Sequence, residues 1–143
     1  MLRVEPQILA NYVAKGLVSL AFSPVLDFGK PSLVASETAE CAGQQSPLAF
    51  WKMHELLYQR QEQISTPNPD LMLQFAKEIG LDEATLKSCL ADPAIAAKVE
   101  RMGKARNDLG IRARPSFSIN EKIYQGSLAY PTFAQILDQL LKK

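Results

Sequence analysis

The strongest constraint on the fold lies in the last third of the chain, where a proline introduces a short alternating segment. After Pro115, the apolar residues Phe117 and Ile119 alternate with serine and asparagine. This two-residue period is typical of a half-buried strand. A Glu-Lys pair at 121–122 has the composition of a short turn, and an Ile-Tyr-Gln-Gly segment follows it. The sequence therefore predicts a β-hairpin over 116–126.

Pro115 itself limits how this hairpin pairs. Proline has no backbone N–H to donate to a sheet, so we expect it at the first position of its strand or on an edge. A proline between a loop and a strand is also a setting for a cis peptide bond. Composition alone favours the trans isomer, because only a few per cent of X-Pro bonds in folded proteins are cis.

Composition sets broad limits on the class of protein. The chain has 143 residues, 47% of them hydrophobic, and a formal net charge of +1. That is enough apolar chain for one globular domain with a core. The nearly neutral charge gives no reason to expect nucleic acid or an anionic membrane as a partner. No apolar run is long enough for a membrane span, and no signal-peptide core is recognisable, so we expect a cytoplasmic protein by default.

The remaining elements are mostly helical. A helix is expected from Glu5 to Gly16, and the apolar segment 17–23 has the pattern of a buried strand. The further expected helices span 32–45, 47–63, 70–79, 82–90, 93–109 and a terminal segment from Tyr130. The order of helix, strand, helical block, hairpin and helix predicts an α/β fold with a helical insertion and a small sheet.

Few residues are candidates for chemistry. Cys41 and Cys89 are either a redox pair or sensor, or structural residues that form a bridge or remain buried free thiols. We favour a structural role, because reactive cysteines need an electropositive, partly open setting that neither context shows. His54, the only histidine, has no Cys, His or carboxylate at metal-ligand spacing. We therefore expect it to pack on a helix, and we expect neither a metal nor a cofactor.

Three segments resemble the DsbA-like branch of the thioredoxin fold, in the order of that family. They read Ala-Glu-Cys-Ala-Gly-Gln-Gln at 39–45, Phe-Trp-Lys-Met-His-Glu-Leu-Leu at 50–57 and Gly-Ile-Arg-Ala-Arg-Pro-Ser-Phe-Ser-Ile-Asn at 110–120. In that family a thioredoxin unit carries an inserted helical domain and performs thiol–disulfide exchange. The resemblance implies one DsbA-like thioredoxin-fold domain over 1–143, with its helical insertion at 31–109 and its thioredoxin portion at 1–30 and 110–143.

The resemblance also implies roles for individual residues. Pro115 corresponds to the cis-proline of the family, and the loop that faces the substrate comprises Ile111, Arg112, Ala113, Arg114 and Pro115. Similar sequences often carry cysteines at similar places, which favours a structural disulfide between Cys41 and Cys89. In the cytoplasm such a bridge would stay reduced, whereas the family is mostly extracytoplasmic. Arg114 departs from the small or β-branched residue that the family tends to have before the proline.

A second departure concerns the reaction. The family's first strand and its Cys-x-x-Cys would lie just before Glu5, and the printed sequence contains no Cys-x-x-Cys. Exchange needs an activated thiolate and a second thiol that resolves the mixed disulfide. We therefore expect an N-terminally shortened chain without redox catalysis of its own, acting as a protein- or peptide-binding module. The alternative is an oxidoreductase whose catalytic N-terminal segment is missing from this reading frame.

The resemblance also implies what the chain would bind. The Pro115 loop would take a polypeptide or a small thiol such as glutathione. Without the family's first strand, segments 17–23 and 116–120 would keep unpaired backbone edges. Three outcomes follow: the two segments pair directly with each other, another chain fills the gap, or the fold is only marginally stable. Of these we expect a homodimer.

Overall fold

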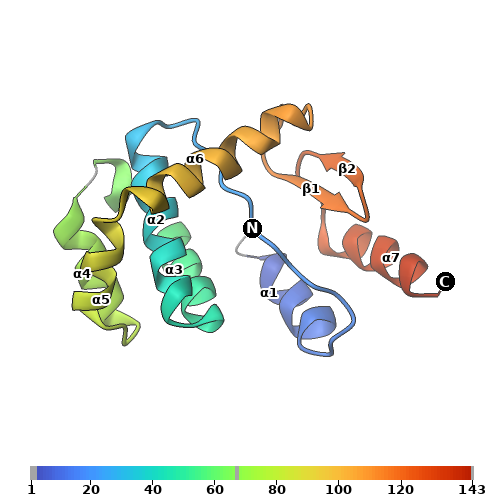
Figure 1. Cartoon of the computed structure of the whole chain (residues 1–143). Coiled ribbons are helices and arrows are strands. Elements are labelled where there is room, and N and C mark those ends of the chain that lie inside the picture. Colours follow the sequence, from blue (N-terminus) through green and yellow to red (C-terminus); the bar gives the residue numbers. More distant parts are fainter. Residues whose placement is uncertain (1–2, 67, 143) are drawn as a thin grey trace. The chain divides into compact units, whose positions relative to one another are not determined.

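The computed structural model describes residues 3–66 and 68–142, which form two compact units (Figure 1). We call Ser23–Arg106 the helical unit, because all its described secondary structure is helical. We call Met1–Phe22 together with Asn107–Lys143 the hairpin unit, because it contains the described sheet. Each unit has its own internal packing and is described separately.

The helices of the helical unit begin where their sequences provide suitable starts. Proline occupies the first turn of several of them, where its missing N–H costs no helical hydrogen bond. Ser46 accepts a hydrogen bond from the Ala49 N–H, and Asn68 accepts one from the Asp70 N–H, so both side chains act as N-caps. The elements are α2 (Lys30–Gln45), α3 (Pro47–Gln59), a 3₁₀ turn η2 (Gln63–Ser65), α4 (Pro69–Glu78), α5 (Glu83–Leu90) and α6 (Pro93–Asp108).

The core of the helical unit forms where α2 packs on α3, α4 and α5, while α4 also contacts α3 and α5. Small residues of α2 allow close approach, since Ala39 and Ala42 are both buried. Larger side chains fill the space between the helices. The fully buried large residues of this core are Met53, Met72, Phe75 and Leu86.

The loop before α2 belongs to the helical unit because it is fastened to α6. Leu26 lies against Gly103, where an added Cβ would be 2.8 Å from the Leu26 Cδ1 atom. Asp27 accepts two hydrogen bonds from the Arg106 guanidinium, at 2.8 and 3.2 Å. The unit therefore starts at Ser23, whereas the sequence interpretation placed its start at residue 31.

Gly103→Ala is expected to destabilise the helical unit by up to about 2 kcal/mol. The added methyl group would overlap with Leu26 at a cost of about 1–3 kcal/mol, against which alanine regains about 1 kcal/mol of helix propensity. In a Leu26→Ala background the overlap is gone, so the same change should stabilise by about 1 kcal/mol. Urea unfolding of the four variants measures this reversal of sign. A destabilising effect of the same size in both backgrounds would contradict it.

The hairpin unit contains a short helix, an antiparallel hairpin and a terminal helix. Helix α1 (Glu5–Ile8) continues into a π-helical turn η1 (Leu9–Val13), and α7 (Tyr130–Leu141) ends the chain's described structure. Strands β1 (Ser116–Ile119) and β2 (Lys122–Gln125) pair with Phe117 opposite Tyr124. Phe117 also contacts Phe133 of α7 edge to face, with ring centroids 4.5 Å apart, which packs the hairpin on that helix.

The hairpin predicted from the sequence is present, but its turn lies one residue earlier than expected. The two turn residues are Asn120 and Glu121, with φ angles of 46° and 68°. Positive φ at both central positions matches the twist of a two-residue hairpin turn, and asparagine adopts it readily. Lys122 is the first residue of β2 and not part of the turn.

The strand predicted at 17–23 is not formed, and this corrects the sequence interpretation. Within 3–66 and 68–142 the sheet consists of β1 and β2 alone. Exposure still alternates along the segment, with Val18, Leu20 and Phe22 half-buried and the residues between them exposed. This half-burial of every second residue has the two-residue period on which the strand prediction was based. The pattern of one segment does not show whether a neighbouring strand is present, and a sheet requires one.

Tyr12 joins η1 to α7 in the hairpin unit. Its hydroxyl donates a hydrogen bond of 2.8 Å to Asp138 Oδ1, and the side chain is buried. Burial first, and then the hydrogen bond to the Asp138 carboxylate, raises the pKa of Tyr12 from 10.0 to about 12.

This pKa predicts a loss of stability in strong alkali. The pKa of Tyr12 is higher in the folded than in the unfolded chain, so its contribution is complete below pH 10.0 and disappears as the pH rises towards about 12. Tyr12→Phe should remove this part of the pH dependence. The measurement is the unfolding midpoint of both proteins over that range, with a tyrosinate absorbance titration beside it. Parallel stability curves for the two proteins would contradict the prediction.

Candidate functional site

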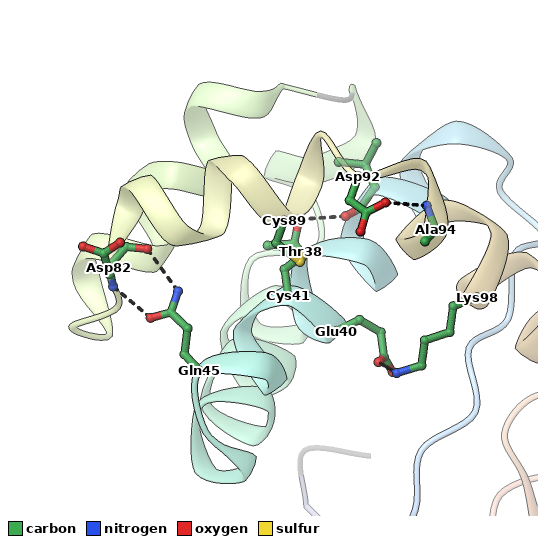
Figure 2. Close-up of a disulfide and its surroundings, with 10 residues drawn as sticks. Thr38, Glu40, Cys41, Gln45, Asp82, Cys89, Asp92, Ala94 and Lys98 are labelled. Atoms are coloured by element: carbon green, nitrogen blue, oxygen red, sulfur yellow. Dashed lines mark hydrogen bonds and ion pairs between the residues drawn. A yellow bond between two sulfur atoms is a disulfide. The ribbon is translucent and has the colours of Figure 1, made fainter.

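Both cysteines of the chain are joined in one disulfide within the helical unit. Cys41 comes from α2 and Cys89 from α5, with their Cα atoms 5.7 Å apart and a sequence separation of 48 (Figure 2). The Cys41 side chain is 0% exposed and Cys89 is 9% exposed. The predicted Cys41–Cys89 bridge is confirmed, and the alternative of two buried free thiols was wrong.

This bond also corrects how the chain compares with its family. The sequence interpretation treated the chain as one that lacks the family's cysteine pair, because it found no Cys-x-x-Cys. A disulfide-bonded cysteine pair is nevertheless present. Its two members are far apart in the sequence and come from two different helices, so a motif search at short spacing does not detect them.

Polar contacts on both sides of the disulfide hold α2 to its neighbours (Figure 2). One helical turn after Cys41, the Gln45 side-chain amide donates to the Asp82 carbonyl and accepts from the Asp82 N–H, both at 3.0 Å. On the other side, Glu40 forms an ion pair with Lys98 of α6. Hydrogen bonds from the Thr85 side chain and from the Thr85 N–H to the Asp82 carboxylate lower the pKa of Asp82. The surroundings therefore stabilise helix packing and contain no free thiol.

The predicted substrate-facing loop lies in the hairpin unit and is fastened to the end of β2. The Arg114–Pro115 peptide bond is cis. The Gln125 Oε1 atom accepts hydrogen bonds from the Arg112 N–H at 3.1 Å and the Ala113 N–H at 3.2 Å. The Gly126 N–H donates to the Pro115 carbonyl at 2.8 Å. These three bonds fix the backbone of the loop on both sides of the proline.

The side chains of the loop present a mixed surface. Arg112 and Arg114 are exposed, while Ile111, Ala113 and Pro115 are half-buried. The Ser116 hydroxyl donates to the Ala113 carbonyl at 2.7 Å, which closes the turn before β1. The loop thus combines apolar contact area with two cationic side chains.

Sequence reasoning missed the part that Gln125 plays. A glutamine at the end of a short strand is an ordinary surface residue in the sequence, and no spacing relates it to a loop twelve positions earlier. The hairpin register explains the contact, because Gln125 lies opposite Ser116, directly after the proline. Only the observed hairpin register, which the sequence analysis did not establish, identifies this contact.

Other candidate features among the described residues are a buried histidine and a shallow hollow. The buried His54 packs edge to face on Tyr58, with ring centroids 4.8 Å apart. No group of three His, Cys, Asp or Glu residues able to hold a metal occurs in 3–66 or 68–142. A shallow hollow of about 320 Å³ lies beside Trp51 and the Glu40–Lys98 pair. Among the same residues, no helix combines the length and apolar character needed to cross a membrane.

Comparison with known proteins relates both the fold and the sequence to disulfide chemistry. The chain is 27% identical over 142 residues to "Disulfide bond formation protein D" of Bacillus subtilis (strain 168), covering 97% of this chain and 64% of that protein. It therefore spans less than two thirds of the length of this curated relative. The relative's name places it among thiol–disulfide oxidoreductases, and this chain is related to that group.

Solved structures agree with the fold. The crystal structure of oxidised BdbD from Bacillus subtilis matches with a TM-score of 0.82 and 27% identity, covering 96% of this chain and 76% of that one. The structure of α-DsbA1 from Wolbachia pipientis matches with a TM-score of 0.71, covering 97% of this chain and 76% of that one. At 17% identity this second likeness shows the fold alone. The predicted thioredoxin-like fold with a helical insertion is confirmed.

The family assignment rests on nearly the whole chain. A family model described as "Thioredoxin" matches residues 2–139. The matched range includes both the disulfide of the helical unit and the Pro115 loop of the hairpin unit. This chain belongs to the thioredoxin family.

Proposed function

We propose that this chain is a polypeptide-binding domain of the thiol–disulfide oxidoreductase type, and that its own residues do not exchange disulfides. One observation carries the proposal: both cysteines of the chain are used in a single buried disulfide. Exchange requires a thiolate to reach one sulfur of a disulfide. The Cys41 side chain is 0% exposed, so an attacking thiol would first have to open the packing between α2 and α5.

The Pro115 loop supports the binding part of the proposal. Its backbone is fixed by Gln125 and Gly126, so little conformational entropy is lost when a ligand binds. Pro115 and Ala113 offer apolar contact, and the exposed Arg112 and Arg114 favour acidic side chains in the ligand. An extended polypeptide with acidic residues matches this surface best, and a small thiol would use less of it.

The redox part of the proposal is tested by insulin reduction and by dithiol oxidation. Cys41→Ser with Cys89→Ser is the matched variant. We expect neither protein to act faster than buffer, since Cys41 is fully buried and Cys89 is only 9% exposed. Activity in the wild-type chain that disappears in the double variant would overturn the proposal and make Cys41–Cys89 the reacting pair.

The binding part needs its own measurement. Carboxymethylated insulin B chain, an unfolded polypeptide without thiols, is titrated into the isotope-labelled chain and followed by NMR. We expect shift changes centred on residues 111–116 and weaker binding in Arg114→Ala. Arg101→Ala makes the same charge change at an exposed arginine of the helical unit and should bind as wild type. Equal loss in both variants would contradict a role for the loop.

A second candidate function rests on the length comparison. The chain covers 64% of Disulfide bond formation protein D of Bacillus subtilis, so residues beyond the printed sequence can supply the reacting cysteines. In that case this chain forms the scaffold and the polypeptide-contacting loop of a complete oxidoreductase. A version extended by the residues encoded upstream would then be active in insulin reduction, while the printed chain remains inactive.

A further inference from the structure

The side chain of Gln125, at the end of β2, contacts the backbone of the Pro115 loop. Its Oε1 atom accepts hydrogen bonds from the Arg112 N–H at 3.1 Å and from the Ala113 N–H at 3.2 Å. Both partners are backbone donors, so this position requires an acceptor, and an amide oxygen has two lone pairs, one for each N–H. Gln125 is itself exposed. Its side chain therefore contributes these two hydrogen bonds rather than buried apolar area.

The two halves of the Pro115 loop are held in different ways. The second half is held by backbone, since the Gly126 N–H donates to the Pro115 carbonyl at 2.8 Å. The first half is held by side chains: Gln125 accepts from its two N–H groups, and the Ser116 hydroxyl donates to the Ala113 carbonyl at 2.7 Å. A substitution at position 125 therefore loosens the first half of the loop and leaves the backbone bond of the second half in place.

We propose that Gln125 is a positioning residue for polypeptide binding: its neutral side-chain oxygen holds the first half of the Pro115 loop in the conformation that the ligand contacts. The inference rests on the proposed function, because it assigns a role within that same site. The apparent dissociation constant rises in inverse proportion to the fraction of chains that hold the binding conformation. Two hydrogen bonds from the loop to one side chain increase that fraction. Gln125 thus acts on the ligand through the loop.

The absence of charge on Gln125 bears on the choice of ligand. The exposed Arg112 side chain favours acidic residues in the polypeptide. A carboxylate at position 125 would accept the same two hydrogen bonds, but its negative charge would lie against the loop and repel those acidic residues. Glutamine therefore fixes the loop without adding negative charge to the surface that an acidic ligand meets.

Three variants and two probes separate the hydrogen bonds from the charge. Gln125→Met keeps an unbranched side chain but removes the strong acceptor, and Gln125→Glu restores an acceptor and adds charge. Gln139→Met is the matched control, because it removes another exposed glutamine of the hairpin unit, in α7. The probes are insulin B chain with carboxymethylated cysteines and the same chain with carbamidomethylated cysteines, which carries fewer negative charges. NMR titration measures each affinity, amide hydrogen exchange at residues 112 and 113 measures loop opening, and circular dichroism checks folding.

Gln125→Met is expected to bind both probes about tenfold more weakly than the wild type and to exchange the two amide hydrogens about tenfold faster, the order of effect of two exposed hydrogen bonds. Gln125→Glu should restore slow exchange and the affinity for the carbamidomethylated chain. It should bind the carboxymethylated chain more weakly than the wild type does. Gln139→Met should match the wild type in every measurement.

The outcomes that contradict the inference are distinguishable from failure of the proposed function. A wild-type chain that binds neither probe overturns the proposed function and this inference with it. If the wild type binds at residues 111–116 and Gln125→Met binds equally well, this inference alone is overturned, whether or not amide exchange becomes faster. A Gln125→Glu variant that recovers slow exchange but not the affinity for the carbamidomethylated chain also overturns it, because the oxygen would then fix the loop without positioning it for a ligand.

Discussion

Replacing both cysteines, Cys41→Ala with Cys89→Ala, is expected to lower the free energy of unfolding of the helical unit by about 4 kcal/mol. The bond joins residues with a sequence separation of 48. Closing a loop of this size removes conformational entropy from the unfolded chain, which stabilises the folded state. The stabilisation lies between the values for loops of about 15 and about 100 residues. Urea unfolding followed by circular dichroism gives the value, with reductant absent.

The reduced wild-type protein is the matched control for this measurement. It keeps both sulfur atoms in the core but has no cross-link, so it separates the effect of the bond from that of the small cavity left by alanine. Because the bridge is buried in the folded chain, the wild type is reduced while it is unfolded in urea; with reductant present it should lose nearly the same stability, and the double variant should be unchanged. A loss below about 1 kcal/mol in both experiments would contradict a structural role for the bridge.

The hairpin shows what local sequence can predict well. Alternation of Phe117 and Ile119 with polar residues identified β1, and a short polar pair identified the turn. Both signals depend on neighbours within a few positions, and the structure has the hairpin at 116–125. The one-residue error in the turn arose because Asn120 accepts positive φ, so the turn occupies residues 120–121 instead of 121–122.

The segment 17–23 shows where such prediction fails. Its apolar pattern is compatible with a strand, and the exposure of Val18 and Leu20 follows that pattern. A strand is completed by the hydrogen bonds of a neighbour, however, and these depend on residues distant in the sequence or on another chain. No local signal contains that information.

The candidate site was predictable to a different extent in each unit. The pairing of Cys41 with Cys89 followed only from resemblance to related sequences, because cysteines 48 positions apart carry no spacing signal. The Pro115 loop was placed by the same resemblance. The contacts of Gln125 with Arg112 and Ala113 were not predicted, since they require the hairpin register.

Phe75→Ala is expected to cost about 3–5 kcal/mol, comparable with loss of the disulfide. Phe75 lies in α4 and is 1% exposed, within the core shared by α2, α3, α4 and α5. Truncation removes the transfer free energy of the ring and leaves a cavity that helices held by a disulfide cannot close easily. Urea unfolding of the oxidised variant measures the loss. Phe75→Leu retains most of the volume and should cost less than about 1.5 kcal/mol.

The stabilisation that Phe75 gains from its contact with Arg60 must be distinguished from the stabilisation due to burial of the ring. The Arg60 guanidinium carbon lies 5.3 Å from the Phe75 ring centroid, and Arg60 also pairs with Glu78 at 2.6 Å. Both interactions are partly exposed, and each contributes no more than about 1 kcal/mol. Arg60→Ala should therefore cost far less than Phe75→Ala. Equal losses of stability in the two variants would contradict this prediction. They would mean that Phe75 stabilises the fold mainly through its contact with Arg60, and that its burial between α4 and the neighbouring helices contributes little.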